Sequence, residues 1–306
     1  MTRSSEASDS ARFHPGLPVA HSPRLRRLAI ELGPWILLNE PGPWSPGSGV
    51  SRDMALGSDA ARGGGGIVRL WEGEQALVVT RREARLPAFD EAREHLLGAG
   101  WPVVVRDSGG TTVPHFPGAL KISLFLPRGP MGGVGVEEVY RLLCEPVREA
   151  LRSLGIDSGY GEVPGSFCDG RFNLVHAGRK VAGTAQRWKG VGPGHSRPPG
   201  YVLAHMILFV EGDLERAIAA VNRFLERAGS TDRFRADAQT TVARALRGAG
   251  IEPLNGPGPG GLMALVRSRT AQAFQRALGM DWEGETAEGV PLQGRGSAQH
   301  GRAKGA

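Results

Sequence analysis

The sequence predicts an α+β (mixed α/β) fold in which helices flank a sheet. Six short segments rich in Val, Ile and Leu are bounded by Gly or Pro, a pattern typical of strands. Elsewhere, apolar residues recur at three- and four-residue steps, which indicates amphipathic helices. Strands and helices do not alternate regularly, so the order argues against a repeated parallel strand–helix–strand fold.

The strand segments are Ile67–Trp71, Gln75–Thr80, Pro102–Val105, Leu120–Leu126, Phe172–His176 and Tyr201–Val210. Several of them are separated by only a few residues. Because such short connections can join only strands that run in opposite directions, we expect antiparallel pairing.

Four helices are predicted, two of them strongly patterned. The first runs from about Val136 to Leu154 and contains Cys144 on its packed side. The second is capped by Asp213 and ends at Gly229. Two weaker helices, Ala236–Arg247 and Gly261–Leu278, flank a run of Gly and Pro that breaks helices.

Composition limits the function classes. The net charge is +6, but the basic residues are scattered and form no long Lys/Arg block with interleaved aromatics, so nucleic-acid binding is not favoured. An acidic protein partner or a generally basic composition explains the charge equally well. No apolar run approaches the roughly 20 residues of a membrane span. Only two cysteines occur, which favours a reducing cytoplasm over a disulfide framework.

The first candidate segment runs from Val105 to His115 and contains Arg106, then Ser108-Gly109-Gly110. Glycines let a backbone approach a ligand closely, and the N–H groups of such a turn can hold an anion or a carbonyl oxygen. The arginine adds a positive charge. The alternative is a plain hairpin turn.

The second candidate segment is the glycine-flanked loop 165–175, which carries Cys168 just before a strand. A thiolate is a strong nucleophile for acyl transfer once its pKa is lowered from about 8.5. We expect Cys168 to be accessible and Cys144 to be buried and inert. The alternative is that Cys168 is an unreactive loop residue.

The third candidate segment is 178–187, where Lys180 lies in a short strand, Arg179–Ala182, that follows a tight turn. A lysine in this place can polarise a carbonyl or activate a thiol. The alternative is an ordinary solvated lysine. Each of the three segments is a weak signal when it is taken alone.

Read in order, the three segments resemble the biotin/lipoate protein ligase and lipoate transferase superfamily. Arg106-Asp-Ser-Gly-Gly with His115 is similar to its arginine, Ser-Gly-Gly, histidine turn, and 178–186 is similar to its lysine segment. Glu83-Ala-Arg-Leu-Pro and the cysteine loop resemble the octanoyl-[GcvH]:protein N-octanoyltransferase branch. The likeness covers roughly residues 30 to 228.

This resemblance implies a central, largely antiparallel sheet flanked by helices, like the catalytic core of class II aminoacyl-tRNA synthetases. It implies that Cys168 accepts the acyl group and that Lys180 binds the acyl carbonyl and helps to deprotonate the thiol. The candidate substrate-binding residues are Arg106, Ser108, Gly109, Gly110, His115, Gly183, Thr184, Ala185, Gln186 and His205.

The chain departs from the family pattern at three places. Lys121 stands where an asparagine is usual, and Asp169 follows the cysteine where proline is common. The stretch Trp188–Pro199, which contains His195, resembles an insertion rich in Gly and Pro. Such changes can alter the specificity of a family member.

Composition, helix pattern and the resemblance together give the expected order of domains. We expect a flexible leader over residues 1–28, a catalytic domain over 29–230, a C-terminal helical extension over 231–282 and a flexible tail over 283–306.

The implied activity is transfer of an octanoyl or lipoyl group through a cysteine thioester to a lysine of a lipoyl carrier domain. The glycine cleavage H protein and the E2 subunits of 2-oxoacid dehydrogenases are the expected partners, and this reaction needs no cofactor. One alternative is an ATP- and Mg-dependent lipoate–protein ligase, for which the segment after about Thr231 looks small as an accessory domain. Another is a lipoyl-domain binder without turnover.

Overall fold

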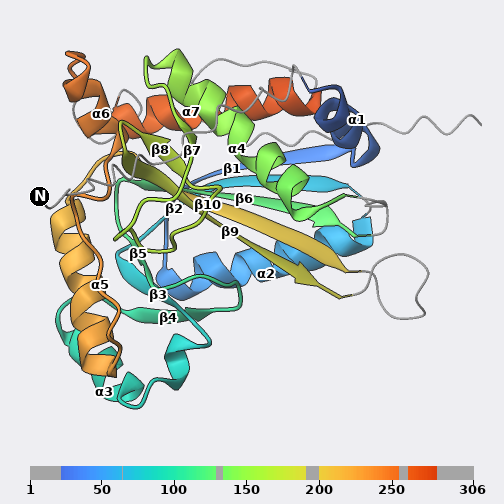
Figure 1. The fold of residues 1–306 in the computed structure, drawn as a ribbon. Helices are drawn as coiled ribbons and strands as arrows, with labels where there is room; N and C mark the ends of the chain where they lie inside the picture. The colour runs from blue at the N-terminus through green and yellow to red at the C-terminus, as the bar shows by residue number, and fades with distance from the viewer. Residues whose placement is uncertain (1–21, 64, 129–133, 191–199, 255–260, 281–306) are drawn as a thin grey trace, which may run out of the picture.

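A computed structural model describes residues 22–63, 65–128, 134–190, 200–254 and 261–280 of the chain (Figure 1). A seven-stranded main sheet has the order β1-β2-β6-β10-β9-β8-β7, and a small sheet has the order β4-β3-β5. The strands of the main sheet are β1 (Trp35–Trp44), β2 (Gly66–Gly73), β6 (Ala119–Pro127), β7 (Gly159–Tyr160), β8 (Leu174–His176), β9 (Arg179–Lys189) and β10 (Tyr201–Phe209). Those of the small sheet are β3 (Ala76–Thr80), β4 (Val103–Arg106) and β5 (Val113–His115).

Helices cover both faces of the main sheet, as Figure 1 shows. They are α1 (Pro23–Glu31), α2 (Pro46–Gly63), α3 (Phe89–Gly98), α4 (Val136–Ser153), α5 (Leu214–Ala228), α6 (Val242–Gly248) and α7 (Leu262–Leu278), with a 3₁₀ turn at Glu83–Arg85. The helices α1, α4 and α7 lie on one face, while α2 and the small sheet lie on the other. Within the main sheet β1 and β2 are parallel and the other neighbours are antiparallel. The predicted fold, a largely antiparallel sheet flanked by helices, is confirmed.

The two faces of the main sheet differ in chemistry. On β2, Val68 and Leu70 point into the large core under α4 and α7, while Arg69 and Trp71 point to the opposite side. The same alternation on β6 turns Lys121 and Ser123 away from that core. Polar side chains are therefore placed on the face that α2 and the small sheet cover.

The expected antiparallel pairing holds for β8 and β9 but is wrong for β2 and β3. The strand β2 already has β1 on one side and β6 on the other, so it has no free edge for β3. The chain instead leaves the main sheet after Gly73, and β3 becomes the centre of the small sheet.

Both strongly patterned helices are confirmed. Asp213 Oδ1 accepts a hydrogen bond of 2.9 Å from Arg216 N at the start of α5, and Gly229 ends this helix with a left-handed φ of 88°. In α4, Cys144 is fully buried, and burial raises the pKa of its thiol well above the ordinary value. The prediction that Cys144 is buried is therefore confirmed.

The weaker helix predicted at Ala236–Arg247 begins later, at Val242. The residues before it run along the start of β9: Lys180 N donates to Ala238 O at 3.0 Å, and Thr240 N donates to Lys180 O at 2.8 Å. These hydrogen bonds hold 238–240 extended beside Lys180. Thr241 then caps α6.

Helix α1 begins within the segment predicted to be a flexible leader, so that prediction does not hold for residues 23–28. Ser22 caps the helix, Pro23 occupies its first turn, and Leu25 and Leu28 are buried.

Residues 1–21 and 281–306 lie outside the described residues. At the other end of the chain, α7 packs on α4 and contributes to the same core as the main sheet. No described helix is both long and apolar enough to cross a membrane.

Candidate active site

A pocket with about 870 Å³ of open space lies between the main sheet, α2 and the small sheet. Tyr201 of β10 and Val78 of β3 are both part of its wall. Of the candidate site residues, those in the wall are Arg106, Ser108, His115, Cys168, Gly183, Thr184, Ala185 and His205. The three sequence segments therefore meet around one pocket.

Cys168 is held in a strained backbone conformation with its thiol against the Ser-Gly-Gly turn. Its φ is +46°, a left-handed value that is uncommon for a residue other than glycine. Thr111 N donates to Cys168 Sγ at 3.0 Å, Arg106 Nη2 lies 3.5 Å from Sγ, and Thr111 Oγ1 accepts from Cys168 N at 2.9 Å. Thr111 Oγ1 also lies 3.4 Å from Sγ, so three donors surround the sulfur, and the thiol can itself donate to Thr111 O at 3.2 Å.

These contacts shift the ionisation of Cys168. Burial by itself would raise the pKa of the thiol, but the positive charges of Arg106 and Lys180 and the hydrogen bonds from Thr111 lower it below the ordinary value. A low thiol pKa increases the fraction of thiolate near neutral pH. The site thus favours the nucleophilic form of Cys168.

The expectation that Cys168 is accessible needs correction. The residue is only 9% exposed, because the turn 107–111 covers it. Cys168 is nevertheless part of the wall of the pocket.

Lys180 lies directly behind the cysteine loop and is fully buried. Its Nζ donates to Phe167 O and, at 3.1 Å, to Cys168 O. The described contacts of this ammonium group are therefore with the backbone of the loop, not with the thiol. Burial lowers the pKa of Lys180 to about 8, while the nearby Cys168 and Asp169 oppose that shift.

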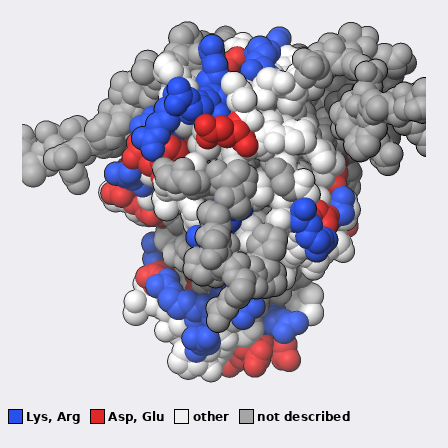
Figure 2. Space-filling model, turned by 90° about the vertical axis from the view of Figure 1, so that its right-hand side faces the viewer, with Lys and Arg blue, Asp and Glu red and all other residues white. Residues whose placement is uncertain are grey.

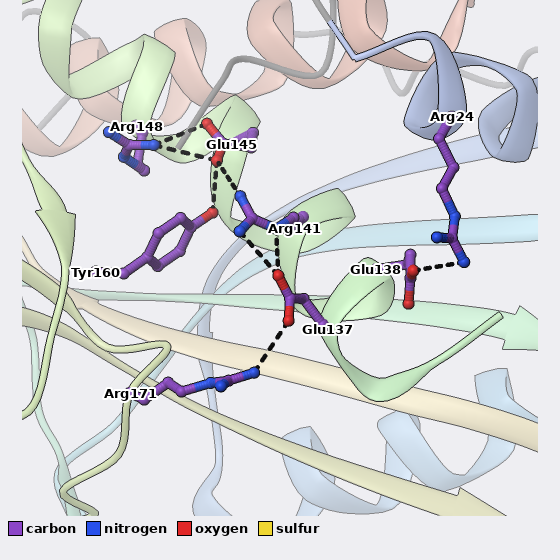
Figure 3. Close-up of polar contacts among 8 residues, drawn as sticks. All are labelled: Arg24, Glu137, Glu138, Arg141, Glu145, Arg148, Tyr160 and Arg171. Atoms are coloured by element: carbon purple, nitrogen blue, oxygen red, sulfur yellow. Dashed lines mark hydrogen bonds and ion pairs between the residues drawn. The ribbon is translucent and has the colours of Figure 1, made fainter. Parts of the chain in front are cut away.

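The cysteine loop is also anchored to α4 by an ion pair, which belongs to the polar network drawn in Figure 3, and by a contact between two rings. Arg171 Nη2 lies 3.0 Å from Glu137 Oε2, and the next residue, Phe172, stacks on Tyr140 with 4.6 Å between the ring centres. Further along α4, Glu145 accepts hydrogen bonds from Arg148 and from the Tyr160 hydroxyl. The Arg171–Glu137 pair is exposed and exposed ion pairs contribute little stability, so we regard it mainly as a way to fix the position of the loop.

The turn between β4 and β5 is not a plain hairpin. These two strands lie on opposite sides of β3, so the turn 107–112 crosses the end of the small sheet. Glu83 holds it there, since its carboxylate accepts 2.8 Å and 2.7 Å hydrogen bonds from Thr80 N and Thr112 N. The hairpin interpretation of this segment is therefore wrong.

Two features require glycine at position 110: its backbone conformation and the closeness of Cys168. Replacing it with alanine should block access to the thiol. The φ of Gly110 is +106°, and a Cβ atom would lie 2.7 Å from Cys168 Sγ and 3.0 Å from Arg106 Nη2. We expect Gly110→Ala to slow alkylation of Cys168 by iodoacetamide roughly tenfold or more. Gly109→Ala is the matched control, because a Cβ there meets nothing within 4 Å. Equal alkylation rates in the two variants would contradict this assignment.

Two histidines lie in the pocket wall and are held in the neutral form. His205 Nε2 is 2.9 Å from Ser108 Oγ, and burial together with the charge of Arg106 lowers the pKa of His205 to about 3. Burial and then the charges of Lys121, Arg106 and His205 place the pKa of His115 well below its ordinary value. Both side chains can therefore donate and accept hydrogen bonds without adding charge.

The segment 183–186 divides between the two faces of β9. A Cβ at Gly183 would lie 2.9 Å from Lys180 Nζ, so only glycine leaves room for that lysine. Gln186 points to α4 instead, where its Nε2 donates to Val136 O at 2.9 Å. Four candidate residues do not line the pocket: Gly109, Gly110, Lys180 and Gln186. The first two belong to the turn beside the cysteine loop, and Lys180 lies against that loop.

The sequence interpretation missed the residues that α2 contributes. Asp53 lines the pocket, where its carboxylate accepts hydrogen bonds from Arg69 at 2.8 Å and Ser123 at 2.9 Å, and burial raises its pKa to about 6. The glycine-rich composition of 46–63 hides this helix. A signal exists, however: Gly49, Asp53 and Gly57 recur at four-residue steps, and the glycines give room for the rings of Trp71 and Tyr201.

The structure also locates the departures from the family pattern. Lys121 is buried in the pocket wall. Asp169 Oδ1 accepts a hydrogen bond of 2.7 Å from Val163 N, which closes the base of the cysteine loop. Of the stretch 188–199, residues 191–199, including His195, lie outside the described residues.

Comparison with known proteins connects this pocket to lipoyl metabolism. Residues 53–245 match the profile of the lipoyl protein ligase A/B catalytic domain. The octanoyl-[GcvH]:protein N-octanoyltransferase of Kyrpidia tusciae is 41% identical over 80% of this chain and 81% of its own length. The enzyme of the same name from Geobacillus kaustophilus is 33% identical over 55% of this chain and 56% of its own length.

Solved structures give the same fold. A T. acidophilum lipoate protein ligase with bound lipoic acid superposes with a TM-score of 0.53 at 19% identity, covering 81% of this chain and 87% of its own. A P. falciparum protein in complex with lipoate gives a TM-score of 0.53 at 12% identity, covering 83% of this chain and 65% of its own. At these identities the likeness confirms the predicted ligase-type fold and nothing more.

Proposed function

The chain belongs to the lipoyl protein ligase A/B catalytic domain family, and from this premise we propose that it transfers an octanoyl group to a lysine of a lipoyl carrier domain through a thioester on Cys168. The name of the relatives supports the acyl group and the glycine cleavage H protein as a carrier. We propose E2 lipoyl domains as further acceptors; one structural neighbour was solved as a lipoate protein ligase and its E2 lipoyl domain.

The observation that carries this proposal is the thiol of Cys168 in the wall of the pocket, with a lowered pKa and three donors around its sulfur. An inert cysteine needs no such surroundings. Cys144 of the same chain, packed in α4 with a raised pKa, shows the contrast.

In the first half-reaction the Cys168 thiolate attacks the carbonyl carbon of the donor. A carbon–sulfur bond forms, the bond to the donor's nitrogen or sulfur breaks, and the leaving group takes a proton. The donors at the sulfur are Thr111 N, Thr111 Oγ1 and Arg106 Nη2, so we propose that Thr111 and Arg106 stabilise the negative charge before attack. Lys180 holds the loop in place through its two carbonyl contacts.

In the second half-reaction the neutral ε-amine of the acceptor lysine attacks the thioester. A carbon–nitrogen bond forms, the carbon–sulfur bond breaks, and the Cys168 thiolate is regenerated. The amine nitrogen loses one proton, which balances the proton taken up by the leaving group in the first half-reaction. A thioester is already an activated acyl group, so we propose that no ATP or Mg is consumed. Since both cysteines are free thiols and the mechanism needs one of them reduced, we propose a cytoplasmic location.

The surface charge fits a protein partner better than nucleic acid. On the face drawn in Figure 2, Lys and Arg side chains form separate groups with Asp and Glu beside them, not one continuous basic surface. Nucleic-acid binding normally uses a basic patch or stripe.

Intact mass spectrometry tests the proposal. Incubation of the full chain with octanoylated H protein, without ATP, should add one octanoyl mass to the protein, and an apo lipoyl domain should then remove it. If acylation requires ATP, or if lipoate supports ATP–pyrophosphate exchange, the chain is a ligase. If the carrier binds tightly but neither mass change occurs, the chain is a non-catalytic binder.

A further inference from the structure

Lys121 of β6 and His115 of β5 form a polar subsite in the pocket wall whose hydrogen-bonding groups are largely unused. The two residues are 3% and 8% exposed, and both line the pocket. Within the described segments, Lys121 Nζ donates only to Gly73 O, at 3.5 Å, which is a long and weak hydrogen bond. Among the residues that the structure describes, the His115 ring has no hydrogen-bond partner; it meets Trp71 edge-on, with 5.8 Å between ring centres.

The charge of Lys121 is also not matched by a nearby carboxylate. Within the described parts of the chain, no carboxylate oxygen lies within 4 Å of its Nζ, and Glu72, which acts on it from a distance, is paired with Arg267. The Trp71 ring, 5.6 Å from Nζ, offers only partial compensation. A buried cation is normally paired, so the pocket itself is the place from which a partner would come.

The position of Lys121 matches the far end of a medium-chain acyl group. Lys121 pairs with Ile207, which pairs with Gly183, so Lys121 lies two strand spacings, about 10 Å, across the sheet from Gly183. Gly183 lies next to the Lys180 ammonium group, which donates to the carbonyl of Cys168. An extended chain of about nine atoms spans roughly 10 Å, which is close to the length of an octanoyl chain.

We propose that the pocket holds a medium-chain acyl group whose distal end carries an anionic oxygen group such as a carboxylate, bound by Lys121 and His115. This inference rests on the proposed acyl transfer through Cys168 and adds the class of acyl chain. The ammonium group supplies the charge, and the neutral imidazole supplies a further hydrogen bond.

The same subsite can also accept an unsubstituted chain. Burial lowers the pKa of Lys121 to about 7, so near neutral pH the side chain can lose its proton and present no buried charge to a methyl group. A bound anion would instead favour the ammonium form. The proposal is therefore that, of two chains of equal length, the pocket binds the one with the anionic end more tightly.

The preference can be tested without any acyl transfer, by calorimetric titration of the full chain with two eight-carbon probes that share an uncharged amide end. The probes are octanamide and suberic acid monoamide, which differ only in a terminal methyl or carboxylate. We expect the wild-type protein to bind the monoamide more tightly, and Lys121→Met to lose roughly tenfold or more of that affinity while it binds octanamide at least as well. Lys189→Met is the matched control, since Lys189 is an exposed lysine of the same sheet that does not line the pocket.

The outcomes separate the two proposals. An equal ratio of the two affinities in the wild type and in Lys121→Met overturns the subsite, and so does failure of the wild type to bind the monoamide at all. The substitution replaces a buried charge by an apolar side chain of similar length, so loss of folding is not expected. If the monoamide binds as expected but no octanoyl or carboxyacyl group ever loads onto Cys168, the proposed function fails while the subsite stands.

Discussion

Cys168→Ala is expected to lower octanoyl transfer by at least about a thousandfold, because it removes the atom that accepts the acyl group. The pocket, the turn 107–111 and Lys180 all remain, so the carrier domain should still bind. The measurement is the initial rate of transfer from octanoylated H protein to an apo lipoyl domain, together with the intact mass of the enzyme. The acyl-enzyme mass should disappear in the variant.

Cys144→Ala provides the matched control, because it is the same chemical change at a buried cysteine in α4. We expect transfer within about twofold of the wild type and a small loss of stability from the cavity. Full activity in Cys168→Ala would eliminate the thioester route. Equal losses in both cysteine variants would indicate a folding defect and not a catalytic one, and thermal unfolding of the two variants distinguishes these cases.

Much of this fold could be predicted from periodicity, and the failures have physical causes. The helices at Val136 and Asp213 are visible because their apolar faces are regular and their ends carry capping residues. The strand β1 is obscured by Pro41, Gly42 and Pro43, and α2 by its glycines. Tertiary contacts override local preference there, as when Gly49 and Gly57 fit against the aromatic rings of Trp71 and Tyr201.

The candidate site, like the fold, could be predicted only in part from the sequence. The family-like order of Arg106, Cys168 and Lys180 predicts that they meet, and the structure brings all three together. No local sequence pattern indicates which group touches the sulfur. That depends on the left-handed φ of Cys168 and on the crossing of the turn over β3, which place Thr111 and Arg106 at the thiol and Lys180 at the loop carbonyls.

Lys180→Met is expected to reduce acyl-enzyme formation by about a hundredfold or more, through misplacement of the cysteine loop. The variant loses both hydrogen bonds from Nζ to Phe167 O and Cys168 O, and a shift of the nucleophile by about 1 Å costs roughly this much. Folding should survive, because the loss of two buried hydrogen bonds is offset by removal of a desolvated charge whose pKa is lowered to about 8. Lys189→Met again serves as the control.

A second readout separates positioning from acid–base chemistry. The pH profile of Cys168 alkylation by iodoacetamide reports the thiol pKa, which depends first on Arg106 and then on Lys180 among the charges that lower it. In Lys180→Met we therefore expect that profile to move upward only slightly, while acyl transfer falls far more. An upward shift large enough to account for the whole loss of activity would mean that Lys180 acts mainly on the ionisation of the thiol. Because the donors at the sulfur, from Thr111 and Arg106, remain in the variant, the geometry favours the smaller shift.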